Sequence, residues 1–481
     1  MKRKVILIVI LLVLGGIYFI LTLSDEPLDE SERYVNIEKT IRKQKLIADL
    51  DSLVSFFEKI HPNPYRFQSK SDFLSFLEQK KVSFPDSLSI INFWRLVDEV
   101  TCRYNDAHSN ATDFYVLNDY VQKKGTFFPF DAEIQNQKLF ITRSHLKRFD
   151  TLIGSEIKRI NGLNTETLVQ KLVRQSSRET EALDLKEVSE DFGFYLWKTF
   201  DWGPNFEIEY QTKNDALLDT LKIDGVLWEN RKDDGIKEEQ SYNFNFLNEA
   251  IGYMKIMDFN NGSRKDFNNF YEESFKRLKE SKSEYLILDF RGHDGGADQY
   301  GEDLAKYISA KPFRKMKKTI WKVTPEFKQA FDRRFVPKGI RWFKPIYLFN
   351  EYSKVFYGAN SYDTIVVEPE FKFPNKESER FTGNVFLIID HNTFSAGSIF
   401  AEMFKHFKMG TVVGQPSGNL TSFNGFALSE YVLPNSKLTI KVSSAYNIAN
   451  SGNEGLQTVV PDVFIDANDD PIQFIEKSLI D

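Results

Sequence analysis

The sequence predicts a mixed α/β protein with a parallel sheet in its C-terminal half. From residue 250 onward, short apolar runs alternate with segments in which apolar residues recur at helical spacing. Strands are expected at 251–256, 285–290, 385–389 and 411–413, and helices at 267–278, 302–308 and directly after Ser395. Strands that are separated by single helices pair in parallel with right-handed crossovers, so these strands are expected in one sheet.

The composition is that of a globular protein and excludes some classes of partner. The 481 residues are 41% hydrophobic and 27% charged, and the formal net charge is −6. This acidic balance argues against nucleic acid as the main partner. The single cysteine, Cys102, permits no intrachain disulfide. Because it lies in an apolar helical pattern, it is disfavoured as a nucleophile.

The N-terminus carries a targeting signal. Lys2, Arg3 and Lys4 precede an uncharged apolar run over 5–23, and acidic residues follow at once. About 19 apolar residues with a basic flank are typical of a membrane-spanning signal-anchor, here residues 1–24. A cleaved signal peptide, which would make the protein secreted, is the alternative. Either way, the rest of the chain is expected outside the cytoplasm, in the periplasm or at the cell surface.

The rest of the chain divides by pattern into five parts. The predicted parts are a linker over 25–40, a helical domain over 41–120, a small module over 121–195, a connecting segment over 196–249 and a catalytic core over 250–481. An insertion is expected at 311–380, where the α/β rhythm breaks. Within the module, the stretch from Gly154 to Gly162 is similar to the strand and turn of PDZ domains, although a generic hairpin also fits, and a helix is expected at 165–173.

Ser395 is the candidate nucleophile. It lies between the strand 385–389 and a helical pattern, and the small residues Ala396 and Gly397 follow it. A strand-to-helix turn exposes a hydroxyl, and the helix N-terminus adds partial positive charge for a developing oxyanion. Serine is also a common N-cap, so the same residue also fits a purely structural role.

A second strand-to-helix turn is predicted at Asp289-Phe-Arg-Gly-His-Asp-Gly295-Gly296. Like the Ser395 turn, it follows an apolar strand and precedes a helix. If both strands belong to one parallel sheet, their carboxyl ends meet at the same edge, where open α/β sheets place their sites. An N–H group of Gly295 or Gly296 is therefore expected to contribute to an oxyanion hole, together with the N–H of Ala396. A phosphate-binding loop is disfavoured because no Gly-Lys-Ser/Thr follows.

Together, Asp289-Phe-Arg-Gly-His-Asp-Gly-Gly and Thr393-Phe-Ser-Ala-Gly-Ser resemble the two signature segments of the S41 serine peptidases. This family comprises tail-specific processing proteases, the tricorn core and retinoid-binding relatives. Asp106-Ala-His108-Ser is similar to an element that precedes the PDZ region in many members. The resemblance implies a ClpP/crotonase-like α/β core with a parallel sheet, in addition to the helical domain and the PDZ-like module.

The family activates serine in two ways. Processing proteases use a lysine about 25 residues after the serine, but the corresponding stretch, 414–420, contains none. Lys405 and Lys408 are expected to point along the helix that follows Ser395. The tricorn-like branch uses a histidine base that a glutamate orients. His108 matches the histidine, and Glu454 matches the glutamate in a segment one residue longer than usual.

The resemblance therefore implies a Ser395–His108–Glu454 triad, in which histidine deprotonates the hydroxyl and the carboxylate orients the imidazole. His293 and His391 are weaker candidates for the base, with His293 first, and His61 is interpreted as structural. Without the family match, His108 also fits a structural loop histidine. No cofactor or metal is implied, because no cluster of His, Cys and Asp has ligand spacing.

The sequence thus predicts a membrane-tethered serine endopeptidase that hydrolyses extracytoplasmic polypeptides. The PDZ-like module is expected to recruit an extended polypeptide by strand addition. The main alternative is a non-catalytic ligand- or peptide-binding protein on the same scaffold, and a small-ester or amide hydrolase is a third possibility. The oligomeric state does not follow from the sequence.

Overall fold

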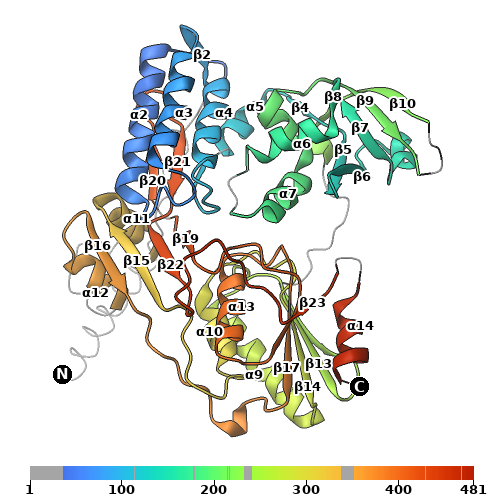
Figure 1. Cartoon of the computed structure of the whole chain (residues 1–481), viewed down its shortest axis with the longest axis vertical. Helices are drawn as coiled ribbons and strands as arrows, with labels where there is room; N and C mark the ends of the chain where they lie inside the picture. The colour runs from blue at the N-terminus through green and yellow to red at the C-terminus, as the bar shows by residue number, and fades with distance from the viewer. Residues whose placement is uncertain are drawn as a thin grey trace, which may run out of the picture.

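The computed structural model describes residues 36–480, except for 113, 177–178, 214, 216, 232–240, 337–350, 428 and 467–468. Helices and sheets are both abundant, so the predicted mixed α/β class is confirmed. Figure 1 shows a helical bundle and a sheet module above a larger layered core. The predicted membrane segment, 1–24, and most of the linker 25–40 lie outside the described residues. None of the described helices is long and apolar enough to span a bilayer.

The region 41–120, predicted as helical, forms four helices. They are α2 (Lys43–Ile60), α3 (Lys70–Val82), α4 (Ile90–Cys102) and α5 (Phe114–Gln122). Ser69 and Ser89 cap α3 and α4, because each side chain accepts the N–H of the third residue after it. The apolar faces of α2 and α4, with Leu50, Phe57 and Val97, are fully buried in one core.

The C-terminal part of the chain returns to this bundle. Strands β20 (Ser429–Val432) and β21 (Thr439–Val442) pair with the short strand β3 (Asn110–Ala111), and Ile440 and Val442 join the core of the bundle. A second small pair, β1 (Thr40–Arg42) with β2 (Ser87–Ser89), lies at its other end. Because β3 follows α4 directly, this pairing fixes the loop between them, residues 103–109.

The module that follows is an antiparallel sheet with three helices. Its strands have the order β10-β9-β7-β6-β5, and the short strand β8 pairs with β7. The bounds are β5 (Phe130–Gln135), β6 (Lys138–Ser144), β7 (Glu156–Ile160), β8 (Leu163–Asn164), β9 (Asn205–Gln211) and β10 (Asp219–Asp224), with α6 (Thr165–Val173), α7 (Glu181–Glu190) and α8 (Phe192–Phe200). Strands β9 and β10 come from the predicted connecting segment, so the sheet extends past residue 195. A short ladder joins β4 (Thr126–Phe127) to β11 (Val226–Leu227).

The core contains a six-stranded sheet in the order β12-β13-β14-β17-β18-β23. Strand β12 is antiparallel to β13, and the four other pairings are parallel. The bounds are β12 (Tyr242–Phe246), β13 (Ile251–Ile256), β14 (Tyr285–Asp289), β17 (Asn384–Ile389), β18 (Thr411–Gly414) and β23 (Val463–Phe464).

Both faces of this sheet are buried, which explains the continuous apolar runs of its strands. Helices α9 (Arg264–Ser281), α10 (Asp298–Ala305) and α13 (Ala396–His406) pack on one face through side chains such as Leu288 and Leu387. On the other face, Ile287 and Ile388 lie in a smaller cluster with Ile475 of α14 (Pro471–Ile475). Alternate residues of one strand thus face opposite layers.

The predicted insertion, 311–380, contributes to a separate four-stranded sheet in the order β16-β15-β22-β19. It supplies β15 (Lys318–Val323), α11 (Pro325–Phe335), α12 (Glu351–Gly358) and β16 (Asp363–Val367), whereas β19 (Phe423–Gly425) and β22 (Ala445–Ile448) come from later in the chain. Figure 1 shows this sheet between the helical bundle and the core.

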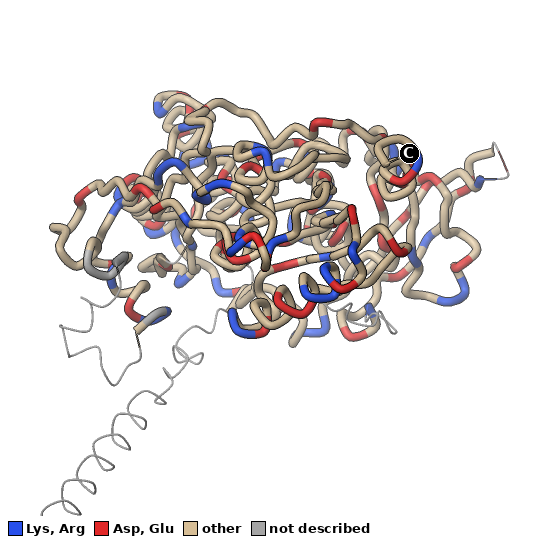
Figure 2. Tube along the Cα trace, turned by 90° about the horizontal axis from the view of Figure 1, so that it is seen from below, with Lys and Arg blue, Asp and Glu red and all other residues tan. Residues whose placement is uncertain are grey.

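Charged residues are spread over the whole molecule. Figure 2 shows basic and acidic positions interspersed along the trace, and neither sign forms a long uninterrupted stretch. Arg291, just after β14, forms an ion pair with a buried residue. Its guanidinium donates to both carboxylate oxygens of Asp289. This pair holds the start of the glycine-rich turn against its own strand.

Candidate active site

Ser395 lies directly before α13, at the carboxyl end of β17. Its backbone angles, φ 50° and ψ −116°, are rarely adopted by residues other than glycine. The side chain makes no capping hydrogen bond with the helix, so the purely structural role as an N-cap is not what this serine performs. A strained turn that leaves the hydroxyl uncommitted to the helix is typical of a functional position.

His108 approaches this hydroxyl from the loop between α4 and β3. Its Nε2 lies 3.1 Å from Ser395 Oγ, although 287 residues separate the two in sequence. The imidazole lies between two phenyl rings, with Phe394 stacked at 5.1 Å and Phe423 at 5.6 Å between ring centroids. These flat contacts limit the tilt of the ring and hold Nε2 toward the hydroxyl.

A buried carboxylate fixes the loop that carries His108. Asp106 Oδ1 accepts the backbone N–H of His108 at 3.0 Å, and Asp106 Oδ2 accepts hydrogen bonds from His61 Nε2 and the Ser109 hydroxyl. His61 Nδ1 accepts the N–H of Asn63, so the proton of a neutral His61 ring is on Nε2 and points at Asp106. His61 and Asp106 are both buried, which agrees with the structural role predicted for His61.

The surroundings keep Asp106 ionised. Burial acts to raise the pKa of Asp106, but the hydrogen bond and charge of His61, with further support from His108 and Ser109, outweigh it. The net result is a pKa well below the usual value for an aspartate. The loop before β3 is therefore attached to a permanent negative charge at neutral pH.

The glycine-rich turn after β14 lies against the Ser395 turn. Asp390 Oδ1 accepts the N–H of Gly292 at 3.1 Å, and the Phe394 N–H donates to the carbonyl of His293 at 2.8 Å. Gly295 is closest to the nucleophile, because a Cβ at this position would lie 2.6 Å from Ser395 Cβ. Only glycine permits this approach.

Hydrogen bonds separate the two candidate glycine donors. The N–H of Gly295 donates to His293 Nδ1 at 3.0 Å, so it is already in use. Among the described residues, no hydrogen bond occupies the N–H of Gly296 or that of Ala396. Burial lowers the pKa of His293 to about 4, which keeps its ring neutral and able to accept the Gly295 N–H. Of the three predicted oxyanion donors, Ala396 and Gly296 thus keep an N–H group that no described residue occupies.

The N–H of Ser395 itself is also in use. It donates to Asn419 Oδ1 at 2.5 Å, and Asn419 Nδ2 in turn donates to Glu179 Oε2 at 3.1 Å. The N–H of Leu420 donates to the same oxygen of Glu179 at 3.2 Å. Burial, together with the negative charge of Asp106, raises the pKa of Glu179 to about 8.

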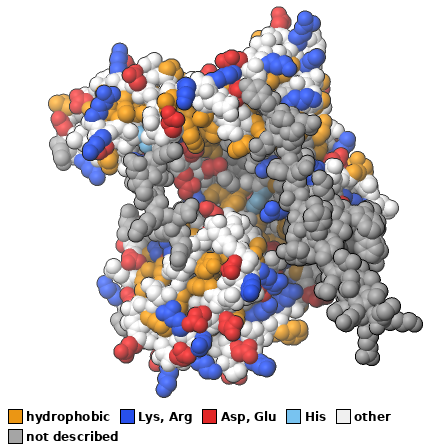
Figure 3. Space-filling view, turned by 180° about the vertical axis from the view of Figure 1, so that it is seen from behind, with side chains coloured by type: hydrophobic (Ala, Val, Ile, Leu, Met, Phe, Trp, Pro, Cys, Tyr) orange, Lys and Arg blue, Asp and Glu red, His pale blue; other side chains and the backbone are white. Residues whose placement is uncertain are grey.

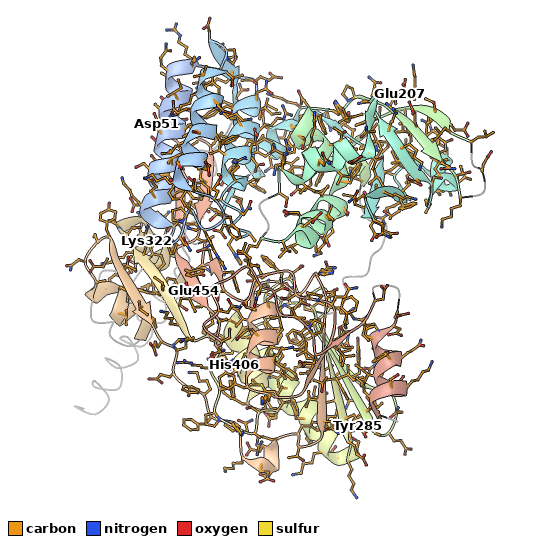
Figure 4. The ribbon with its side chains drawn as sticks, viewed as in Figure 1. Asp51, Glu207, Tyr285, Lys322, His406 and Glu454 are labelled. Carbon is orange, nitrogen blue, oxygen red and sulfur yellow. The ribbon has the colours of Figure 1, made fainter. Side chains whose placement is uncertain are left out.

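Glu454 has a different environment. Glu454 is exposed. Its backbone carbonyl accepts a hydrogen bond from Arg66 at 3.2 Å, and its side chain interacts with the hydroxyl of Tyr446. Figure 4 shows Glu454 near β22, at the junction between the helical bundle and the core. The structure therefore brings Ser395, His108, Ala396 and Gly295 together, all buried or half-buried, and the exposed Gly296 follows Gly295 in the chain. The described contacts of Glu454 point to the rim of this site.

The other candidate bases and nucleophiles have other partners or positions. Lys405 donates to Asp462 at 2.6 Å, and Lys408 is exposed beyond the end of α13. His391 lines a cavity on the far side of the turn. Cys102 is buried at the end of α4, and burial with the nearby Asp98 raises the pKa of its thiol.

A cavity of about 1000 Å³ lies between the sheet module and the core, on the far side of the turn that leads to Ser395. Its walls include the edge strand β5, helix α7 and the loop 390–392, which leads to Ser395. Figure 3 shows the molecular surface hollowed between the core and the parts above it, with acidic and histidine side chains visible in the hollow. An extended chain along β5 would thus lie in a cavity that the loop 390–392 also lines.

Sequence reasoning missed several residues of this site. Phe394, Phe423, Asn419 and Glu179 all contact it, but each looks ordinary in its own segment. Asp106 belongs to the Asp-Ala-His element of the sequence, yet its role as an anchor depends on His61, which lies 45 residues earlier. The one usable signal was the run Gly418-Asn-Leu after β18, where a glycine and an amide follow a strand at the same sheet edge.

Comparisons with known proteins show similarity in fold. Mature CPAF in complex with lactacystin has 12% identity and a TM-score of 0.60, and the match covers 88% of this chain and 94% of that one. Mature CPAF alone has 11% identity and a TM-score of 0.60, over 88% and 92% of the two chains. The photosystem II D1 C-terminal processing protease has 12% identity and a TM-score of 0.43, over 88% and 93%. No curated protein matches the sequence.

The likeness to CPAF shows a shared fold over 88% of this chain. The family comparison is more specific, because it depends on the segments that carry the site. Residues 250–465 match the model of peptidase family S41, and this range contains both the glycine-rich turn and Ser395. The resemblance noted in the sequence is therefore confirmed over residues 250–465, the part of the chain that matches peptidase family S41.

Proposed function

We propose that the protein is a serine endopeptidase in which His108 activates Ser395. One observation carries the proposal, namely the 3.1 Å separation between His108 Nε2 and Ser395 Oγ. A base within hydrogen-bond reach is the first geometric requirement for nucleophilic catalysis by serine. The family match supports peptidase chemistry at this site.

The reaction would run in two steps. His108 Nε2 accepts the proton as Ser395 Oγ attacks the peptide carbonyl, and it then gives that proton to the departing amine. Water, deprotonated by the same ring, hydrolyses the resulting acyl-enzyme and returns the hydroxyl to Ser395. The proton taken in each half-reaction is thus returned to the leaving group, and the ring ends neutral.

The oxyanion would be held by the N–H groups of Ala396 and Gly296. Ala396 begins α13, so the helix dipole adds partial positive charge at this point. Gly296 is favoured over Gly295, because the Gly295 N–H already donates to His293. Loss of one such donor costs about 10²–10³ in kcat in serine peptidases.

Of the three residues of the predicted triad, Glu454 has the smallest proposed contribution to catalysis. As the third member of the predicted triad, it would orient His108, but its exposed side chain interacts with Tyr446. The two phenyl rings and the Asp106 anchor provide most of the orientation in this chain. Glu454 would then act at the rim, for example by adding negative charge near the imidazolium.

The fold and the substrate are also part of the proposal. The five parallel strands of the core support a ClpP/crotonase-like architecture, and the antiparallel sheet with α7 beside its edge strand β5 supports a PDZ-like module. Addition of an extended polypeptide to β5 would place it in the cavity between the module and the core, whose wall also includes the loop 390–392 before Ser395. The basic and apolar N-terminus supports an extracytoplasmic, membrane-tethered enzyme, and fractionation of cells followed by protease accessibility would test this location.

Active-site labelling tests the function most directly. A fluorophosphonate probe should label purified wild-type protein and leave the Ser395→Ala and His108→Ala variants unlabelled, and a peptide library should be cleaved only by the wild type. The alternative of a non-catalytic binding protein predicts no labelling of the wild type at all. Labelling without cleavage of any peptide would favour the small-ester or amide hydrolase instead.

A further inference from the structure

The N–H of Ser395 is tied to a glutamate of another module. Ser395 N–H donates to Asn419 Oδ1, and Asn419 Nδ2 donates to Glu179 Oε2. Glu179 lies just before α7, which packs on strand β5 of the sheet module, whereas Asn419 lies in the loop after β18 of the core. Residues 240 apart in sequence thus meet one hydrogen bond away from the nucleophile.

Glu179 decides which way the Asn419 amide faces. An amide can rotate by 180° about its last bond and exchange its oxygen and nitrogen, so its orientation depends on its partners. Here Glu179 Oε2 accepts hydrogen bonds from both Asn419 Nδ2 and the Leu420 N–H, and with Nδ2 held in this way Oδ1 faces the N–H of Ser395. Without Glu179, Asn419 Nδ2 would be buried with no acceptor, because the residue is fully buried.

The contact is built from several hydrogen bonds. The Leu420 N–H also donates to Glu179 Oε2, and the Thr180 hydroxyl donates to the carbonyl of Gly418 at 2.9 Å. Residues 179–180 therefore hold both sides of Asn419 in the loop 418–420. The other oxygen of Glu179, Oε1, is buried and has no hydrogen-bond partner among the described residues.

Ser395 has a particular need for such support. Its φ of 50° places the N–H and the hydroxyl in an arrangement that a serine adopts only when neighbouring groups enforce it. The hydrogen bond to Asn419 Oδ1 is the contact that holds the N–H, and the next N–H along the chain, that of Ala396, is a proposed oxyanion donor. A rotation of the Ser395 peptide would move the hydroxyl and this donor together.

We propose that Glu179 is a positioning residue for Ser395, and that it acts through Asn419. The proposal rests on the proposed serine peptidase function and adds to it a requirement from outside the core. The module that carries α7 then contributes to catalysis directly, as a support for the nucleophile turn.

A double-mutant cycle tests this role. Full-length wild type, Glu179→Ala, Asn419→Ala and the double variant would be compared by the rate of fluorophosphonate labelling and by kcat and KM on one cleaved peptide. Each single change should lower the labelling rate and kcat about tenfold with little change in KM, because it disturbs the turn and not the substrate cleft. The double variant should be no slower than Asn419→Ala, since Glu179 acts only through that amide.

Two further variants separate positioning from general damage. Glu179→Gln keeps an oxygen acceptor for Asn419 Nδ2 and should recover most of the loss seen in Glu179→Ala. The matched control is Glu181→Ala, an exposed glutamate two residues along in the first turn of α7, which should react like the wild type. Thermal unfolding of each variant would show whether a slow variant is folded. If Glu179→Ala does not fold, the comparison of Glu179→Gln with Asn419→Ala decides.

Three results would overturn the inference. They are a wild-type labelling rate in folded Glu179→Ala, a loss in Glu179→Gln as large as that in Asn419→Ala, and a double variant whose loss is the product of the two single losses. Absence of labelling in the wild type would instead reject the serine peptidase function itself, so the two failures are distinguishable.

Discussion

The Ser395 turn and the Glu454 segment were both predicted to lie in one site, and they differ in how the structure holds them. The Ser395 turn is held by hydrogen bonds that its N–H groups donate to Asn419 and to the glycine-rich loop, and an imidazole lies 3.1 Å from the Ser395 hydroxyl. Glu454 is exposed, and its main chain is held by Arg66. A sequence motif can identify both segments equally well, but only packing reveals which one is rigid enough to place a reacting atom.

Removal of the nucleophile or the base should have the largest effect. Ser395→Ala and His108→Ala should each lower kcat by about 10⁶, to the background rate, because either change alone disables proton transfer and attack. Steady-state cleavage of a peptide and fluorophosphonate labelling would measure this. A His108→Ala variant that keeps more than a few per cent of the activity would mean that another group acts as the base.

A methyl group at Gly295 should have the next largest effect. The added Cβ would lie 2.6 Å from Ser395 Cβ, so the nucleophile must move, and a displacement of about 1 Å costs about 100-fold in rate. We therefore expect Gly295→Ala to lower kcat about 100-fold. Gly292→Ala is the matched control, because Gly292 shares the loop and a positive φ but has open space around its Cβ position. Equal losses in both variants would show that backbone strain, and not contact with Ser395, is responsible.

The anchor of the His108 loop should appear in the pH dependence of stability. Asp106 has a pKa in the folded protein below its usual value of 3.8, so it stabilises the fold above about pH 4, and this contribution is lost as the pH falls through the folded-state pKa. Asp106→Asn should be less stable than the wild type at neutral pH by about 1–3 kcal/mol, the usual cost of leaving a buried hydrogen-bonding group without its partner. Chemical denaturation between pH 7 and pH 3 would measure the difference.

The difference in the free energy of unfolding between the wild type and Asp106→Asn should become smaller as the pH falls toward 3. His61→Ala is the companion variant, since it removes the group whose hydrogen bond lowers the pKa of Asp106. A constant gap across the pH range would contradict the assignment of Asp106 as an ionised anchor.

Glu454 should give the smallest effect of the four. We expect Glu454→Gln to lower kcat only a few-fold, whereas loss of the triad carboxylate costs about 10⁴ in a serine peptidase that depends on it. The same kinetic assay measures both, and Tyr446→Phe is a useful control, because it removes the hydroxyl that interacts with Glu454. A loss near 10⁴ would show that Glu454 turns inward to His108 when substrate binds.

The sequence predicted those parts of the fold that depend on local patterns. Strand β13 and helix α6 begin and end at the predicted residues, because an apolar run and an Asn164 N-cap mark them. The pairing of β9 and β10 with the module could not be predicted, since antiparallel partners more than 40 residues apart leave no local signal. The boundary at 195 was therefore placed too early for this sheet.

In the candidate site, too, the residues with a local sequence signal could be predicted, and those that depend on distant contacts could not. Ser395 and the two glycines could be found because small residues between an apolar run and a helical pattern form a local signal. Glu179 was missed because its importance arises only when the loop after β18 meets α7, 240 residues away. The side-chain exposure of Glu454 was equally invisible, because a glutamate beside a glycine looks the same in a buried and an exposed segment.

The long separation between His108 and Ser395 has a consequence for the cell that makes this protein. Synthesis proceeds from the N-terminus, so the imidazole emerges 287 residues before the hydroxyl that it is proposed to activate. On that proposal, a nascent or truncated chain would be inert, and peptide cleavage would begin only when the segments that carry His108 and Ser395 have come together. The topology itself thus delays the hazard of an active protease until folding is complete.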